Sequence, residues 1–357
     1  MNMLSEWYRR TFSDPQMVLL VLFALAAVLA ISLFGHMLAP AIAAVVIAFL
    51  LDGPTEWLIR RGARRWVAFL SVYLGFILLS VIAMLTVVPL LIQQVSQFIN
   101  DSPAMVGSMR NALLSLQQRF PDLISETQVN TWLTGLGNEI ANLGPKLLQY
   151  SLSGLTGAVA FVVYVVLVPV MVFFFLKDKT QILSWFGSFL PSDKPVLEQV
   201  WGEVLERAGD YARGKVYEIL IVGIAAFITY SVLGLPYATL LAVATGLSVI
   251  IPYFGAAVVT FPVALVAYFQ WGLGGEMATA VIAYLVLQAL DGNLLVPLLF
   301  SEAVKLHPNA IIIGILVFGG IWGFWGVFFA IPLATVANAI IRAWRERSSG
   351  NNSPAKA

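Results

Sequence analysis

Long apolar runs constrain this chain more than any other feature. They lie at about 16–34, 36–51, 66–92 and 154–176, and then continue almost without interruption from 216 to 343. A helix needs about 20 apolar residues to cross a bilayer. Only 11% of the 357 residues are charged, against roughly 25% in a soluble domain. The sequence therefore predicts an all-α polytopic membrane protein with the lipid bilayer as its surroundings.

Composition excludes several kinds of site. The chain has no cysteine, which excludes disulfides, zinc–thiolate sites and iron–sulfur clusters. Its two histidines, His36 and His307, are far apart in the sequence. The net charge of +1 gives no case for nucleic acid. We therefore expect no cofactor and no nucleic-acid partner, and whether a metal ion binds stays open.

Basic residues predict the orientation of the chain, because cytoplasmic loops carry an excess of Lys and Arg. The strongest basic cluster lies at Arg60–Arg65. The first two apolar runs are separated only by Gly35 and His36, so we expect a tight helical hairpin that also places Arg9 and Arg10 inside. Both termini are expected in the cytoplasm. The first run is expected to stay as a span, because no small-residue cleavage site follows a short apolar core.

Alternating apolar and polar stretches predict six parts of the chain. Polar residues at 101–103 are typical of a helix start, and the pattern that follows Ser192–Pro195 predicts an amphipathic helix. The six expected parts are an N-terminal tail with three transmembrane helices (1–92), an external helical segment (93–153), a fourth transmembrane helix (154–176), a cytoplasmic amphipathic segment (177–215), a transport core with broken helices (216–343) and a cytoplasmic disordered tail (344–357).

Proline and glycine residues interrupt the apolar sequence of the second half of the chain. The breaks fall at Pro236, at 251–255, at 271–272 and at 319–326. The piece 236–250 would rise only about 22 Å as a helix, short of a hydrocarbon core of roughly 30 Å. Short segments interrupted by glycine and proline indicate broken helices around a transporter site.

Two pairs of pieces can be threaded in two ways. The pairs are 236–250 with 256–271, and 309–322 with 325–343. Each pair forms either one broken crossing or one re-entrant hairpin. The hairpin is favoured because both breaks fall near the middle of their runs.

Asp291 is the residue that a membrane environment singles out. It lies near the end of an apolar run from about Met277 to Phe300, where an aspartate costs upward of roughly 2.5 kcal/mol. Gln288 and Asn293 flank it, and a helix-breaking proline, Pro297, follows. An ionisable residue at such a place indicates a transport path. The alternative interpretation is a structural ion pair.

Other polar residues extend the hypothesis. Ser248 and Tyr253 flank the first break, where side-chain oxygens and freed carbonyls could coordinate Na⁺ or a polar solute. Glu302 and His307 are candidate proton-linked groups, since histidine has an unperturbed pKa near 6.5. Two simpler interpretations stay open, because Lys305 could neutralise Glu302 and His307 could cap a helix.

Nucleotide binding and catalysis are not expected. Gly209–Lys215 has the spacing of a phosphate-binding loop up to its lysine, but Val216 stands where a hydroxyl is needed and no strand precedes. The chain has no His-Glu-x-x-His motif and no cysteine nucleophile. We therefore expect neither a nucleotide-driven pump nor an enzyme.

Several long strings of the chain, spread from about residue 4 to residue 344, resemble one family. They are Trp7–Arg10, Phe12–Pro15, Phe174–Lys179, Arg213–Lys215, Ile251–Ala256, Gln288–Pro297, Phe300–Pro308 and Phe318–Pro332. In these strings the chain is similar to the PerM-type permeases of the autoinducer-2 exporter family of bacterial inner-membrane proteins. The resemblance implies about eight transmembrane segments, export of small solutes and a homo-oligomer, with pentamers described in the family. Some members are associated with autoinducer-2 export and others with Na⁺/H⁺ exchange.

The function expected from these observations is that of a secondary transporter in the bacterial inner membrane. It would export a small polar solute such as a signalling molecule, or exchange Na⁺ for H⁺, with Asp291 at the coupling site. Two alternatives remain at this point: a passive channel, and a membrane scaffold that holds a partner protein without transporting anything.

Overall fold

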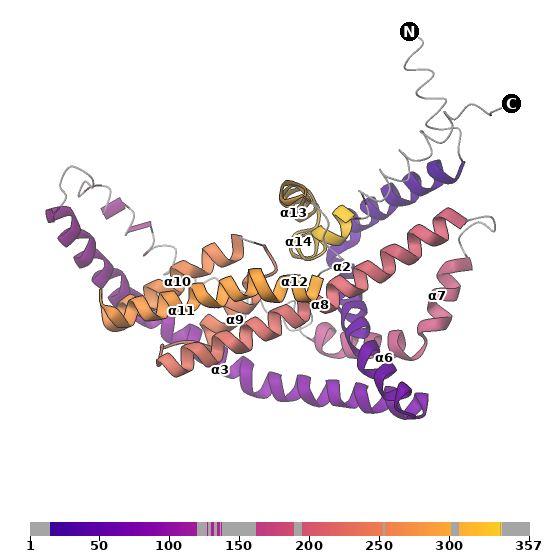
Figure 1. Cartoon of the computed structure of the whole chain (residues 1–357), viewed down its shortest axis with the longest axis horizontal. Helices are drawn as coiled ribbons and strands as arrows, with labels where there is room; N and C mark the ends of the chain where they lie inside the picture. Colours follow the sequence, from indigo (N-terminus) through magenta and orange to yellow (C-terminus); the bar gives the residue numbers. More distant parts are fainter. Residues whose placement is uncertain are drawn as a thin grey trace, which may run out of the picture. The chain divides into compact units, whose positions relative to one another are not determined.

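The chain is helical throughout the part that the computed structural model describes, and no strand occurs there (Figure 1). The structure describes residues 15–119, 127, 130–131, 134–135, 137, 162–188, 195–252, 254–300, 307–335 and 337. By length and composition, five helices in this part could cross a membrane. They are Met37–Arg60, Arg65–Asn111, Gly209–Leu233, Phe254–Trp271 and Gly275–Phe300. The predicted class, an all-α membrane protein with several spans, is confirmed.

Helix α2 (Pro15–Arg60) runs through Gly35 and His36 without a turn, so the predicted tight hairpin is wrong. A glycine costs a helix only about 1 kcal/mol relative to alanine, and Gly35 here serves packing. A Cβ added to Gly35 would lie 2.5 Å from the indole nitrogen of Trp322. The prediction that Arg9 lies inside depended on two membrane crossings by this hairpin, and the continuous helix does not support it.

Helix α3 (Arg65–Arg119) continues through the predicted helix start at 101–103, which is also wrong. Pro103 has no N–H for the carbonyl four residues before it, and the Ser102 hydroxyl donates to that carbonyl, of Ile99, at 2.7 Å. Asp101 accepts a hydrogen bond from the Tyr237 hydroxyl. Burial, together with this bond, raises the pKa of Tyr237. The polar residues thus support a continuous helix instead of starting one.

The chain groups into two compact units. Unit 1 comprises Met1–Val72, Leu167–Lys215 and Phe300–Ala357, and unit 2 comprises Tyr73–Val166 and Val216–Leu299. Unit 1 contains α2, α6 (Val168–Lys177), α7 (Lys179–Ser188), α13 (Pro308–Trp322), α14 (Phe324–Phe328) and the first part of α8 (Pro195–Leu233). Unit 2 contains most of α3, the rest of α8, α9 (Ala238–Ser248), α10 (Phe254–Trp271), α11 (Gly275–Leu290), the π-helix η2 (Asp291–Leu295) and most of α12 (Val296–Phe300).

Two helix pairs fold back on themselves where the sequence predicts breaks. Helix α9 packs against α10 within unit 2, and α13 packs against α14 within unit 1. A Cβ on Gly255 would lie 1.8 Å from the Ser248 carbonyl oxygen, and a Cβ on Gly326 would lie 1.8 Å from that of Phe318. Only glycine allows a backbone to approach so closely. The predicted breaks at 251–255 and 319–326 are confirmed as tight turns.

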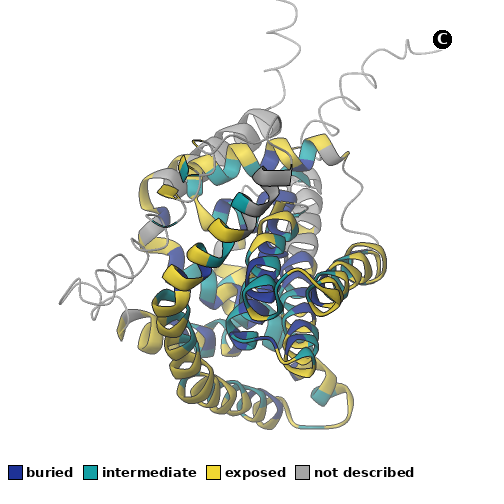
Figure 2. Cartoon of the chain, turned by 90° about the vertical axis from the view of Figure 1, so that its left-hand side faces the viewer, coloured by how far each residue is buried: buried dark blue, intermediate teal, exposed yellow. Residues whose placement is uncertain are grey.

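The helix surfaces are strongly apolar. Many exposed residues, yellow in Figure 2, are large hydrophobics, and in α3 they include Leu78, Leu79, Leu85 and Ile92. Within α3, no residue of the most apolar stretch is buried. Soluble monomers rarely expose apolar patches of more than a few hundred Å². These surfaces are suited to lipid or to other subunits, as expected of a multi-pass membrane protein.

Candidate functional site

Asp291 begins a π-helical turn that joins α11 to α12 without a break. The Val296 N–H donates to the Asp291 carbonyl, five residues back instead of four. Pro297 follows in α12, and its ring would clash with the carbonyl four residues before it in a regular α-helix. The wider turn relieves this clash. The expected helix break at Pro297 is therefore wrong, and π turns are frequent at functional sites.

A second π turn in the chain also precedes a proline. A second π-helix, η1 (Val163–Leu167), is also followed by Val-Pro, at Val168-Pro169. Each π turn ends at a leucine that is followed by Val-Pro, so the same tripeptide accompanies the π geometry in both places. The residues of η1 are all apolar except the Tyr164 hydroxyl, whereas η2 begins Asp-Gly-Asn. The polar triplet is what makes η2 the candidate site.

The predicted residues around Asp291 differ in their surroundings. Asp291 is half-buried, and its Oδ1 atom is shielded from solvent. Gln288, one turn earlier, is also half-buried; its amide nitrogen is shielded and donates no hydrogen bond to any residue that the structure describes. Asn293 is exposed and its amide donates to the Ala289 carbonyl at 2.8 Å. Gln288 and Asp291 thus form the shielded part of the site.

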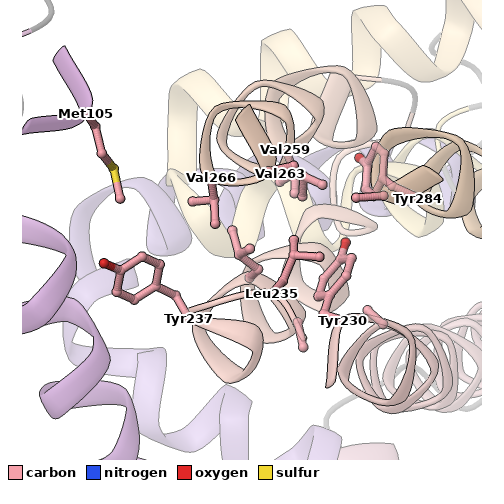
Figure 3. Packing of buried hydrophobic residues seen from close by; sticks show 13 residues of the cluster. Met105, Tyr230, Leu235, Tyr237, Val259, Val263, Val266 and Tyr284 are labelled. Carbon is pink, nitrogen blue, oxygen red and sulfur yellow. The ribbon is translucent and has the colours of Figure 1, made fainter. Parts of the chain in front are cut away.

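A buried polar cluster lies between α8 and α9. The Tyr230 hydroxyl is 2.9 Å from the Thr245 hydroxyl, and both side chains are fully buried. Ser248, predicted as a site residue, is buried one turn further along α9 and donates to the Thr245 carbonyl at 2.7 Å. Tyr230 belongs to the apolar core of unit 2, with Leu235 and Val263 (Figure 3). The cluster therefore brings three hydroxyl groups into an otherwise apolar interior.

Tyr284 connects this cluster to the α11 helix. Its hydroxyl donates to the Ala256 carbonyl at the start of α10, and the side chains of Thr260 and Gln288 lie beside it. Tyr230 and Tyr284 both belong to the buried cluster of Figure 3. The buried core of unit 2 thus contains two tyrosines, Tyr230 and Tyr284, that the sequence analysis did not select.

Glu218 is a second carboxylate that the sequence analysis missed. Its side chain is only 2% exposed, and it lies within the candidate span Gly209–Leu233. It shares the buried face of α8 with Val222, Ala226 and Tyr230, which follow at four-residue spacing. Buried carboxylates in spans are rare and mark transport paths. In the sequence, Glu218 lies two residues inside the apolar run that begins at 216.

The remaining predicted residues are His307, Tyr253 and Glu302. His307 lies in unit 1, is exposed and caps α13, its Nδ1 accepting from the Asn309 N–H at 3.2 Å. The capping interpretation of His307 is therefore confirmed. Tyr253 and Glu302 lie outside the described residues. In the described part of the chain, no group of three or more His, Cys, Asp or Glu side chains could hold a metal ion.

Known proteins resemble the chain over almost its whole length. Residues 17–346 match the family described as AI-2E family transporter. The chain is 44% identical over 347 residues to "Putative permease PerM" of Escherichia coli strain K12, covering 96% of this chain and 98% of that protein. It is 26% identical over 310 residues to "Putative transport protein YrrI" of Bacillus subtilis (85% of each chain), and 28% identical over 302 residues to "Putative transport protein YueF" of the same organism (82% of this chain and 80% of that protein). The chain belongs to the AI-2E family of transporters.

Proposed function

We propose that the chain is a secondary transporter of the bacterial inner membrane that uses Asp291 as its coupling carboxylate. The observation that carries this proposal is the position of Asp291 in a π turn of the apolar span Gly275–Phe300, one turn from the shielded amide of Gln288. A carboxylate is costly at such a position. Its placement is explained if it binds and releases a cation or a proton during transport.

The π turn supplies further oxygen ligands for this role. Pro297 brings no N–H, so a carbonyl of the preceding turn keeps a lone pair for another partner. In transporters with irregular helices, backbone carbonyls that lack a helical hydrogen bond coordinate Na⁺ or H⁺. Asp291 and such a carbonyl belong to the same turn, which would provide several oxygen ligands for a small cation. The Gln288 amide adds a hydrogen-bond donor for a polar solute.

Glu218 and the tyrosine cluster extend the path within unit 2. Tyr230 and Tyr284 place two hydroxyls in the core, and Glu218 lies on the same face of α8 as Tyr230. Solute export and Na⁺/H⁺ exchange both need groups that change charge or exchange hydrogen bonds inside the membrane. Asp291 and Glu218 are the two carboxylates proposed to do so.

We propose that the basic loops after α2 and after α6 lie in the cytoplasm, and contacts within unit 1 support this orientation. The Lys179 ammonium lies 2.7 Å from the Asp52 carboxylate, which brings the end of α2 and its basic cluster, Arg60–Arg65, to the basic end of α6. Two basic loops on one side favour the cytoplasm. We also propose assembly as a homo-oligomer, with the exposed apolar length of α3 as the surface available to a second copy.

Reconstituted proteoliposomes test the function. Flux of candidate small polar solutes and of Na⁺ is measured with an imposed Na⁺ gradient, an imposed H⁺ gradient or neither. We expect one solute or Na⁺ to move against its own gradient when one of the two ion gradients is imposed. Flux that only equilibrates each solute would indicate a passive channel, and no flux in any condition would contradict the transport proposal.

A further inference from the structure

Unit 1 contains a cavity of about 610 Å³ where two helices end and two begin. Helix α2 ends at Arg60 and α3 begins at Arg65, while α6 ends at Lys177 and α7 begins at Lys179. Residues from all four helices line it. Its volume is within the usual range for small-molecule sites, and nothing in the proposed transport path uses it.

The charges that line this cavity are balanced. Three are acidic (Asp52, Glu56 and Asp178) and three are basic (Arg65, Lys177 and Lys179). Asp52 and Lys179 already neutralise each other at 2.7 Å. Glu56, Asp178 and Arg65 make no ion pair with any other residue in the described part of the chain. Lys177 lies over the Phe173 ring, 5.8 Å from its centroid, and makes no salt bridge with any other residue that the structure describes. Two carboxylates and two cationic groups therefore remain for a ligand, which favours a zwitterion over a simple anion or cation.

The helix ends reinforce this pattern. The N-termini of α3 and α7 carry partial positive charge and attract phosphate, while the C-termini of α2 and α6 carry partial negative charge and attract ammonium groups. Arg65 lies at the first residue of α3 and Lys177 at the last residue of α6. At each of the two junctions, helix ends of both signs and at least one charged side chain therefore lie beside the cavity.

One wall of the cavity is aromatic. The Trp66 and Phe69 ring centroids are 5.5 Å apart, and Phe69 contacts Phe173 edge to face at 5.2 Å. Trp66 is exposed, as tryptophans are at membrane–water interfaces. An apolar wall beside balanced charges matches a molecule that is charged at one end and apolar at the other.

From these observations we propose that this cavity, the headgroup cavity, binds the phosphoethanolamine headgroup of a phospholipid. Arg65 and Lys177 hold the phosphate, and Glu56 and Asp178 hold the primary ammonium. A choline headgroup is a poorer ligand because its quaternary nitrogen has no N–H to donate to a carboxylate. The glycerol and the acyl chains lie along the Trp66 wall.

Native mass spectrometry tests this proposal on the full-length protein in detergent, with equimolar phosphatidylethanolamine, phosphatidylcholine and phosphatidylglycerol. We expect preferential retention of phosphatidylethanolamine. Arg65→Gln should lower that retention roughly tenfold, since it removes a charge-assisted hydrogen bond to the phosphate. Glu56→Gln should narrow the preference for ethanolamine over choline.

Arg64→Gln is the matched control, because it removes the same charge from a neighbouring residue that does not line the cavity. Retention by this variant should stay within about twofold of the parent protein, as for other surface substitutions. Where Arg65→Gln does not fold, Lys177→Gln carries the same expectation. Equal retention of the three lipids by the parent protein, or equal losses in the Arg64 and Arg65 variants, would overturn the proposal.

Soluble phosphoethanolamine carries the same charged groups as the lipid headgroup. It therefore distinguishes binding of a membrane lipid from binding of a free compound. Its displacement of bound phosphatidylethanolamine supports recognition through the headgroup. Retention of the soluble compound without retention of the lipid would overturn the assignment to a membrane lipid.

Discussion

Asp291 and Glu218 are carboxylates within helices that are long and apolar enough to cross a bilayer. One is half-buried in a π turn, and the other is almost completely buried on a regular α-helix. Each placement opposes the strong preference of a carboxylate for water. Because the two lie on different helices of unit 2, a transporter could change the charge of one without directly disturbing the backbone of the other.

Glu218→Gln is expected to lower gradient-driven flux at least about tenfold, a loss equivalent to roughly 1.4 kcal/mol. Glutamine keeps the size of the side chain and removes its ability to bind a proton or a cation. The control is Glu276→Gln, which makes the same change at an exposed residue in the first turn of α11. Flux in proteoliposomes measures both variants. A Glu218→Gln protein that transports like the Glu276→Gln control would remove Glu218 from the path.

Asp291 could be selected from the sequence, whereas Glu218 was missed for a specific reason. The sequence predicts an apolar run that begins at residue 216, so Glu218 falls at the expected boundary between a polar and an apolar segment. Helix α8 has no boundary there, since it runs from Pro195 to Leu233. Tyr230, Thr245 and Tyr284 could not be selected, because their importance comes from packing between helices that are distant in the sequence.

At the scale of helices, the α9–α10 and α13–α14 pairs depend on glycines at their turns. Gly255→Ala is expected to destabilise the protein by about 1–3 kcal/mol or more, because the new methyl group overlaps the Ser248 carbonyl. Gly320→Ala is the control, since nothing lies within 4 Å of a Cβ at this exposed helical position. It should be neutral or stabilising by up to about 1 kcal/mol. Thermal unfolding in detergent compares the two, and equal melting temperatures would contradict the tight turn.

Pro297 is expected to maintain the π turn at the cost of helix stability. Pro297→Ala removes the clash that the wider turn relieves, so a regular α-helix becomes available and Asp291 rotates away from its present position. Thermal stability should stay equal or rise, since an interior proline costs a helix about 3 kcal/mol, while gradient-driven flux falls.

The matched control for this substitution is Pro262→Ala, which removes a proline from the interior of α10, where no π turn occurs. Its flux should remain at the level of the parent protein. Full flux in the Pro297→Ala variant would show that transport does not need the π turn.

Sequence patterns predicted the helix ends well only where no side chain compensates for a helix breaker. The start of α8 at Pro195 and the turns around 251–255 and 319–326 were predicted correctly. Pro103 does not end α3, because Ser102 satisfies the carbonyl that the proline leaves open. Gly35 does not end α2, because Trp322 packs against it. Both exceptions depend on bonds or contacts that single-residue preferences do not contain.

For the whole molecule, the threading of the spans decides which loops share a side. Helix α9 has 11 residues and rises about 16 Å, too short to cross a core of roughly 30 Å. Since α9 packs against α10, we propose that the pair enters and leaves the membrane on one side. The turns before α9 and after α10 would then both lie outside, and α11 to α12 would cross to the inside.

Cysteine labelling tests this threading in a chain that has no cysteine of its own. Leu273→Cys, in the exposed turn between α10 and α11, should react with a membrane-impermeant maleimide in intact spheroplasts. Ala63→Cys, in the basic loop after α2, should react only in inverted vesicles. Labelling of Leu273→Cys from the cytoplasmic side alone would mean that α9 and α10 form a single broken crossing.

The transport role of Asp291 is tested most directly by Asp291→Asn in proteoliposomes with an imposed ion gradient. The control is Asp210→Asn, which makes the same change at an exposed residue of α8 that pairs with Arg213. Size exclusion and thermal unfolding first establish that both variants fold like the parent protein. We predict that accumulation against the solute gradient is lost with Asp291→Asn and kept with Asp210→Asn. Accumulation at the parent level in a folded Asp291→Asn protein would contradict the role assigned to this carboxylate.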